Sequence, residues 1–286
     1  MTQAEQNGQP AHAHAVLAGP AWSEPFDADR RAELRRDRPF ETASDRSWLS
    51  SRGGGVSVAV IDSGIEGDHP AVGGRLARSV RVELDGDVAT IVDDEPIDVV
   101  GHGTACAGII HSLVPDAELV SVRVLGRNNR GKGIAFAYGL DWVIQQGIPV
   151  ANLSLSSRSE DLYASFHDLA DQAYFANTVL VCAASNTPGQ SSFPSLFSSV
   201  ISVAAHDIPD PLAWFYNPRP PVEFGAWGVD VPVAWRGGSS IGATGNSFAT
   251  PNIAGLVAKI RDTFPSATPF EVKALLAAGA REPSAA

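Results

Sequence analysis

Apolar residues in this chain gather in five short runs that are separated by longer amphipathic stretches. Each run carries apolar, often β-branched side chains at successive positions, which is typical of a strand covered on both faces. The runs span Val56–Ile61, Leu119–Leu125, Pro149–Leu155, Thr178–Ala184 and Val200–Ala205. The stretches between and after them predict helices over Thr104–Ser112, Ile134–Gln146, Leu162–Phe175, Ser247–Thr263 and Pro269–Ala278.

This alternation of strands and helices indicates an α/β fold with a doubly wound, mainly parallel β-sheet that carries helices on both faces. In such sheets, ligands bind beyond the carboxyl ends of the strands, where the direction of the crossovers changes. Functional residues should therefore lie just after strands. Residues 1–52 mix charges with proline and alanine, so we expect a partly flexible N-terminal extension followed by one domain over residues 53–286.

The composition narrows the class of protein. Of the 286 residues, 44% are hydrophobic and the net charge at pH 7 is −11, which indicates a globular chain whose surface repels a phosphate backbone. No apolar stretch reaches the about 18 residues of a membrane span, and residues 1–20 lack the pattern of a secretory signal. Two cysteines, Cys106 and Cys182, agree with a reducing compartment. We therefore expect a cytoplasmic protein that binds neither nucleic acid nor membranes.

Three short motifs place chemically active side chains at the ends of predicted elements. Asp62 ends the first apolar run in Ile-Asp-Ser-Gly, His102 opens a helix in Gly-His-Gly-Thr, and Ser247 opens another in Gly-Asn-Ser-Phe-Ala-Thr-Pro. A serine at a helix N-terminus lies where backbone amides favour developing negative charge. Asp, His and Ser in this chain order are the parts of a nucleophilic triad, in which the serine attacks, the imidazole carries its proton and the acid orients the imidazole.

The order and the local motifs resemble those of the subtilisin-like serine proteases, the subtilase family, over roughly Gly54 to Gly279. The resemblance implies a subtilisin-like fold and a serine endopeptidase that hydrolyses peptide bonds through an acyl-enzyme. By the same resemblance, Asp62 is the orienting acid, His102 the general base and Ser247 the nucleophile. The chain is most similar to compact intracellular members, and a peptide or protein is the expected substrate.

Further positions take roles from this resemblance. Asn186, in Ala-Ala-Ser-Asn, resembles the carboxamide donor of the oxyanion hole, and Asn246, where the family commonly has threonine, is expected to donate there as well. The substrate-binding positions implied by the resemblance are Arg130, Gly131, Lys132, Ser154, Leu155, Ser156, Ser185 and Ser192. Ser156, Ser185 and Ser192 stand at positions where the family usually has glycine. We therefore expect a narrow pocket for the substrate residue before the scissile bond. The cations Arg130 and Lys132 either favour acidic residues further upstream or are solvated edge charges.

The sequence predicts no metal site and no cofactor. Gly108–Pro115 runs on directly where secreted relatives carry a calcium loop, so calcium binding remains possible but the high-affinity loop is missing. Cys106 follows His102 at an i, i+4 spacing that suits a metal, but the chain has no Cys-x-x-Cys and we expect no zinc. Cys106 instead resembles the cysteine beneath the catalytic histidine of thiol-dependent subtilases, which predicts sensitivity to mercurials.

Two other classes of hydrolase share parts of these motifs. An aspartic protease needs a second Asp-Ser/Thr-Gly, and an α/β-hydrolase needs a glycine after Ser247-Phe248 and a different order of the triad, so the sequence excludes both. The alternative that stays open is a subtilase-fold binding or scaffold protein with impaired catalysis. The sequence leaves undecided whether the substrate is one dedicated precursor or protein in general, what residues 1–52 do, and how the chain oligomerises.

Overall fold

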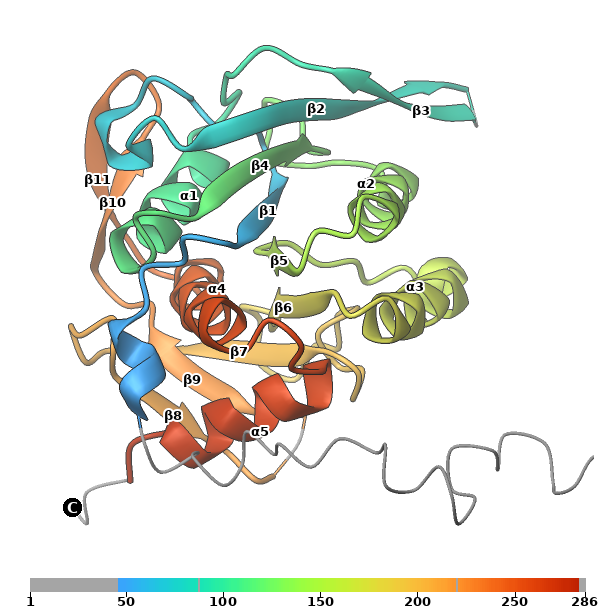
Figure 1. Ribbon diagram of the computed structural model, residues 1–286. Helices are drawn as coiled ribbons and strands as arrows, with labels where there is room; N and C mark the ends of the chain where they lie inside the picture. Colours follow the sequence, from blue (N-terminus) through green and yellow to red (C-terminus); the bar gives the residue numbers. More distant parts are fainter. Residues whose placement is uncertain (1–45, 87, 220, 283–286) are drawn as a thin grey trace, which may run out of the picture. The chain divides into compact units, whose positions relative to one another are not determined.

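The computed structural model describes residues 46–86, 88–219 and 221–282, and a nine-stranded sheet runs through the middle of this part. The strands lie in the order β3-β2-β4-β1-β5-β6-β7-β9-β8 (Figure 1). The parallel strands that form its centre are β1 (Ser57–Asp62), β4 (Glu118–Arg123), β5 (Val150–Leu153), β6 (Val179–Ala183) and β7 (Ile201–His206). These five strands confirm the five runs predicted from the sequence.

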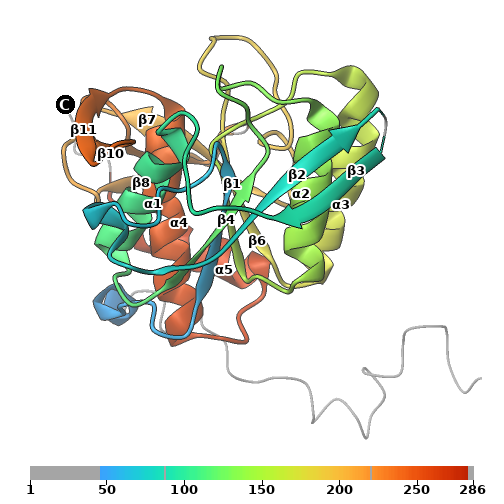
Figure 2. The same cartoon turned by 90° about the horizontal axis from the view of Figure 1, so that it is seen from above.

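Five helices pack on the two faces of this sheet. They are α1 (His102–Leu113), α2 (Gly133–Gln145), α3 (Tyr163–Phe175), α4 (Asn246–Thr263) and α5 (Pro269–Gly279). Both views place α1 and α4 on one side of the sheet and α2 and α3 on the other (Figures 1 and 2). One apolar core cluster joins the sheet to α1, α4 and α5, and a second joins it to α2 and α3. The predicted doubly wound α/β architecture is therefore confirmed.

Antiparallel elements at both edges of the sheet were missing from the sequence prediction. At one edge, β2 (Leu76–Asp85) pairs with β3 (Val88–Asp93), and at the other β8 (Trp214–Tyr216) pairs with β9 (Phe224–Trp227). A separate hairpin joins β10 (Val231–Trp235) to β11 (Ser239–Ala243). Strands β2 and β3 alternate polar and apolar residues around an Asp-Gly pair, which is a hairpin signal that could have been used.

The first described residues are anchored on the domain. In the 3-10 helix Arg46–Ser50, Trp48 is buried and its ring centroid lies 5.8 Å from that of Trp214. The carboxylate of Asp262 accepts hydrogen bonds from Ser51 Oγ (2.6 Å) and Gly53 N (3.1 Å). The predicted flexible extension thus ends in a packed segment, and its residues 1–45 lie outside the described part of the chain.

Strand β1 lies where the direction of the crossovers changes. It pairs with β4 on one side and with β5 on the other, and all three strands run in parallel. The chain passes over one face through α1 before it enters β4, and over the opposite face through α2 before it enters β5. Asp62, the last residue of β1, therefore lies at the position where sheets of this kind bind ligands.

Candidate active site

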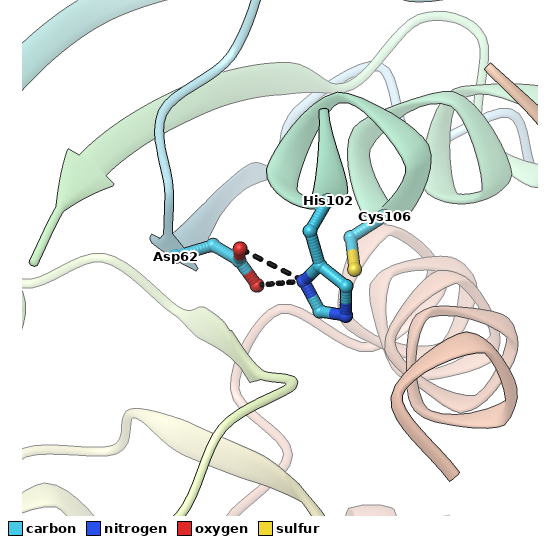
Figure 3. Close-up of side chains that lie close together, drawn as sticks. All are labelled: Asp62, His102 and Cys106. Atoms are coloured by element: carbon cyan, nitrogen blue, oxygen red, sulfur yellow. Dashed lines mark hydrogen bonds and ion pairs between the residues drawn. The ribbon is translucent and has the colours of Figure 1, made fainter. Parts of the chain in front are cut away.

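Asp62 and His102 form a buried pair at the carboxyl edge of the sheet (Figure 3). The Nδ1 atom of His102 lies 2.8 Å from Oδ1 and 2.9 Å from Oδ2 of Asp62. Oδ1 also accepts a hydrogen bond from the backbone N–H of Ser63, at 2.7 Å. Because the carboxylate accepts at Nδ1, the imidazole carries its proton there, and Nε2 is left as the basic nitrogen.

Electrostatics at this pair favour a protonated imidazole. Burial of His102 opposes its charge, but the charge of Asp62, its hydrogen bond and the charge of Asp98 together outweigh burial and raise the pKa of His102 above its usual 6.5. The phenyl ring of Phe248 lies against the imidazole, with ring centroids 5.3 Å apart. His102 is thus a strengthened base that is held in place from two sides.

Two glycines allow α1 to begin where the pair needs it. Gly101, at the N-cap, has φ of 117°, a left-handed conformation that residues with a Cβ rarely adopt. Gly103 packs so closely on the first strand that an added Cβ would lie 2.1 Å from the carbonyl oxygen of Gly64. The glycines that flank His102 therefore bring the start of α1 down onto the end of β1.

Asp98, which the sequence analysis did not single out, organises this helix start. Its Oδ1 accepts hydrogen bonds from Ser63 Oγ and the amides of Val100 and Gly101, at 2.7–2.9 Å. Its Oδ2 accepts from the amide and the hydroxyl of Thr104, at 2.8 and 2.7 Å. An acidic residue shortly before a helix start is a capping signal, and here it satisfies amides on both sides of His102.

Ser247 lies in the first turn of α4, a helix whose residues from Phe248 to Arg261 are all buried. Pro251 has no N–H, so the carbonyl oxygen of Ser247 has no helical donor four residues later. Two side chains from other elements bond to this oxygen instead, Ser154 Oγ at 2.8 Å and Cys106 Sγ at 3.6 Å. The backbone of Ser247 is thereby fixed to the end of β5 and to α1.

The hydroxyl of Ser247 donates to the carbonyl oxygen of Ser154, at 3.1 Å. His102 and Ser247 line the same cavity, which has a volume of about 570 Å³. To donate to the imidazole, the Ser247 hydroxyl has to leave the Ser154 carbonyl, and catalytic hydrogen bonds commonly tighten only when substrate is bound. Asp62 is therefore bonded directly to His102, while Ser247 lines the same cavity as His102.

Asn186 and Asn246 have different hydrogen-bond partners. The backbone N–H of Asn246 donates to Asn186 Oδ1, at 2.9 Å. This bond orients the carboxamide of Asn186 and does not use its Nδ2 donor. In Asn246, Nδ2 donates to the carbonyls of Ala184 and Ser185, both at 3.1 Å, and Oδ1 accepts from Ala205 N at 2.9 Å. Both amide hydrogens of Asn246 are therefore engaged. This differs from the expectation that Asn246 donates to an oxyanion, because its side chain holds the segment before Asn186.

Most of the predicted substrate-binding residues line the cavity. They are Arg130, Gly131, Lys132, Ser154, Leu155 and Ser156. The two remaining serines do not line it. Ser185 hydrogen-bonds Thr187 in a tight turn, and Ser192 is buried with its hydroxyl 3.2 Å from that of Ser195. The buried position of Ser192 differs from the prediction that it narrows a substrate pocket, because its hydroxyl is taken up within its own loop.

One group of described side chains has metal-ligating atoms close together, and it coincides with the Asp–His pair. Atoms of Asp62, His102 and Cys106 all lie within 4.8 Å of one another (Figure 3). Burial, with the charges of Asp62 and Asp98, raises the pKa of the Cys106 thiol well above its usual value. A metal ion at this place has to displace both the thiol proton and the Asp62–His102 hydrogen bond, so the group suits catalysis better than metal binding.

The fold and the buried acid–imidazole pair beside a helix-borne serine define a class of serine-dependent hydrolases. The model of the subtilase family matches residues 53–285, and the chain therefore belongs to this family. The thermostable alkaline protease of Halalkalibacterium halodurans is 35% identical over 234 residues, a match covering 77% of this chain and 61% of that protein. Subtilisin BL of Lederbergia lenta is 34% identical, with 77% of this chain and 81% of that protein covered.

Similarity extends to solved structures and to a relative that is described as intracellular. A cold adapted subtilisin-like serine proteinase superposes with a TM-score of 0.65 and 27% identity, covering 80% of this chain and 83% of that one. An intracellular serine protease of Paenibacillus polymyxa is 29% identical, with 75% of this chain and 69% of that protein covered. In the described part of the chain, no helix is both long and apolar enough to cross a membrane.

Proposed function

We propose that this chain is a serine endopeptidase in which Ser247 is the nucleophile, His102 the general base and Asp62 the orienting acid. The observation that carries the proposal is the buried Asp62–His102 pair, whose imidazole lines the same cavity as a serine at a helix N-terminus. Asp62 holds the Nδ1 proton of His102, so Nε2 accepts the proton of the Ser247 hydroxyl. The substrate is a peptide or protein, as for other members of the family.

The reaction follows from this arrangement. Ser247 Oγ loses its proton to His102 Nε2 and attacks the carbonyl carbon of the scissile peptide, and Nε2 then gives the proton to the leaving amine as the C–N bond breaks. Water repeats the sequence on the resulting ester and releases the acid product. The imidazolium formed in each half is stabilised by the buried carboxylate of Asp62.

The oxyanion is stabilised by Asn186 Nδ2 and by the backbone N–H of Ser247. The bond from Asn246 N to Asn186 Oδ1 orients the carboxamide, and the Ser247 amide lies in the first turn of α4, where it has no intrahelical acceptor. Loss of one such donor typically lowers kcat by about 100- to 1000-fold. Asn186→Ala should therefore reduce kcat by this factor with little change in KM, whereas Asn186→Asp should be worse because its charge repels the oxyanion.

A fluorophosphonate probe tests the nucleophile, because only an activated serine reacts with it. The wild-type chain should be labelled and should cleave casein, and Ser247→Ala should lose labelling and about 10⁴- to 10⁶-fold of kcat while its far-ultraviolet circular dichroism is unchanged. Labelling of a folded Ser247→Ala chain would place the nucleophile elsewhere. A wild-type chain that is folded but neither labelled nor active would support a binding or scaffold role instead.

A proteome-wide cleavage assay distinguishes two biological roles, the processing of one precursor and general protein turnover. Cleavage at one or few sites in a lysate indicates processing of a dedicated precursor, and cleavage of many unfolded proteins indicates general turnover. A cytoplasmic location is part of the same proposal, and fractionation of cells that express the full chain tests it.

A further inference from the structure

The cavity beside Ser247 carries a strong excess of positive charge. Arg130 and Lys132 contribute from the segment before α2, and Arg158 contributes from the segment after β5. The cavity is not lined by any aspartate or glutamate among the described residues. The three cations thus stand around one space, although they come from two different connections of the sheet.

These cations are free to meet a charged ligand. Arg130, Lys132 and Arg158 are exposed, and in the described part of the chain none of them has a carboxylate within ion-pair distance. Arg158 Nη1 donates to Gln190 Oε1 at 2.9 Å, a neutral partner that steadies the side chain and leaves its charge uncompensated. Three uncompensated cations at one site attract an anion more strongly than any one of them alone.

The rest of the chain makes this local charge unusual. The net charge is −11, from 21 basic and 32 acidic residues, so most of the surface repels an acidic peptide. A cleft lined by one sign of charge concentrates the field and raises the local concentration of ligands of the opposite sign. The cavity is therefore where an acidic segment of a substrate gains the most from leaving the solvent.

We infer that this peptidase selects substrates with aspartate or glutamate within a few residues of the scissile bond, held by Arg130, Lys132 and Arg158. The inference rests on the proposed function and names the substrate class for that site. It replaces the alternative of solvated edge charges, because Arg158 adds a third cation to the same cavity from a different connection of the sheet. Side chains of an extended peptide alternate in direction, so neighbouring acidic residues reach different walls.

Matched peptide nitroanilides provide the test. One peptide carries glutamate at the third and fourth positions before the scissile bond, and its control carries glutamine at both. An exposed ion pair changes affinity by about 1.4- to 5-fold, so two acidic residues that each pair with one cation should raise kcat/KM by about 2- to 30-fold, mostly through KM. The ratio should fall towards 1 in 1 M salt, where the screening length is only about 3 Å.

Variants separate this cavity from the general charge of the protein. The triple variant Arg130→Ala, Lys132→Ala, Arg158→Ala should reduce the glutamate-to-glutamine ratio to about 1, and the corresponding triple glutamate variant should prefer lysine peptides. Arg127→Ala is the matched control, because Arg127 is an exposed cation of the same connection that does not line the cavity, and it should keep the parent ratio.

Three outcomes are distinguishable: two overturn the inference alone, and one overturns the proposed function. A parent enzyme that cleaves both peptides with equal kcat/KM at low salt refutes the acidic selectivity and leaves the peptidase proposal intact, and so does a preference that the triple alanine variant retains. A parent enzyme that cleaves neither these peptides nor casein refutes the proposed function itself.

Discussion

Replacing Asp98 with asparagine should both destabilise the fold and change the acid–base behaviour of His102. Asp98 accepts hydrogen bonds from Ser63, Val100 and Gly101 through Oδ1, and two from Thr104 through Oδ2. Asparagine keeps the shape and one acceptor oxygen. Its Nδ2 donor, however, then faces the amide of Thr104, so a buried N–H group loses its acceptor.

The size of the effect follows from these contacts. An orphaned buried amide costs about 1–3 kcal/mol, and each of the three bonds that change from a charged to a neutral acceptor weakens by about 1 kcal/mol. Asparagine is easier to bury than a carboxylate, which offsets part of this loss. We therefore expect Asp98→Asn to lower the free energy of unfolding by about 3–5 kcal/mol. For a chain of this size, that lowers Tm by about 10 °C.

Stability is best measured by urea unfolding of Asp98→Asn in a Ser247→Ala background, which prevents self-digestion. Asp68→Asn is the control, because Asp68 is an exposed carboxylate without a hydrogen-bond partner among the described residues. In the active background, loss of the Asp98 charge should also lower the pKa of His102 and move the acid limb of the kcat/KM profile to lower pH. A change in unfolding free energy below about 1 kcal/mol, with an unmoved acid limb, would refute this account of Asp98.

Four further predictions concern the same site. The raised pKa of His102 means that kcat/KM should fall on acidification with a midpoint above 6.5, and that the protonated imidazole stabilises the fold at low pH, a contribution lost as the pH rises through the folded pKa; a midpoint at or below 6.5 would contradict this. Mercurials should inhibit slowly, because the Cys106 thiol is buried beside His102, and Cys106→Ala should stay active and resist them; equal inhibition of both would place the reactive thiol elsewhere. A chelator should hardly change Tm, because α1 continues without a calcium loop to Leu113, whereas a fall of more than about 10 °C would reveal a bound ion. Profiling of cleavage sites should show small or medium residues before the scissile bond, because the side chain of Ser156 lines the cavity where a glycine would leave more room, and dominant cleavage after Phe or Tyr would contradict this.

The central strands and helices could be predicted because their signal is local. Each buried strand is a continuous apolar run, and each helix has its own period, so neither depends on distant residues. The edge strands β8 and β9 are short, and β10 and β11 form a separate hairpin, so their pairing depends on partners that the pattern does not reveal. The hairpin of β2 and β3 is different, since the alternation of polar and apolar residues and the Asp-Gly pair at its turn predict it from the sequence alone.

The candidate site shows the same limit at the level of single atoms. Asp62, His102 and Ser247 could be proposed from the sequence because each ends or begins a recognisable element. Asn246 was expected to donate to the oxyanion. Its side-chain Nδ2 instead donates both hydrogens to carbonyls that lie 61 and 62 residues away in the chain. The partners of a side chain at such separations are set by the packing of α4 against β6 and β7, which no local motif encodes.

The proline in the second turn of α4 has a mechanical consequence. Pro251 donates no hydrogen bond to the Ser247 carbonyl, which accepts from Ser154 and Cys106 instead. The first turn of α4 is therefore bonded to neighbouring elements and has one hydrogen bond fewer to the rest of its own helix. Small shifts or fraying further down the helix are therefore poorly transmitted to the serine. With Ser247 as the proposed nucleophile, we expect substitutions in the C-terminal part of α4 to lower stability more than the rate of bond cleavage.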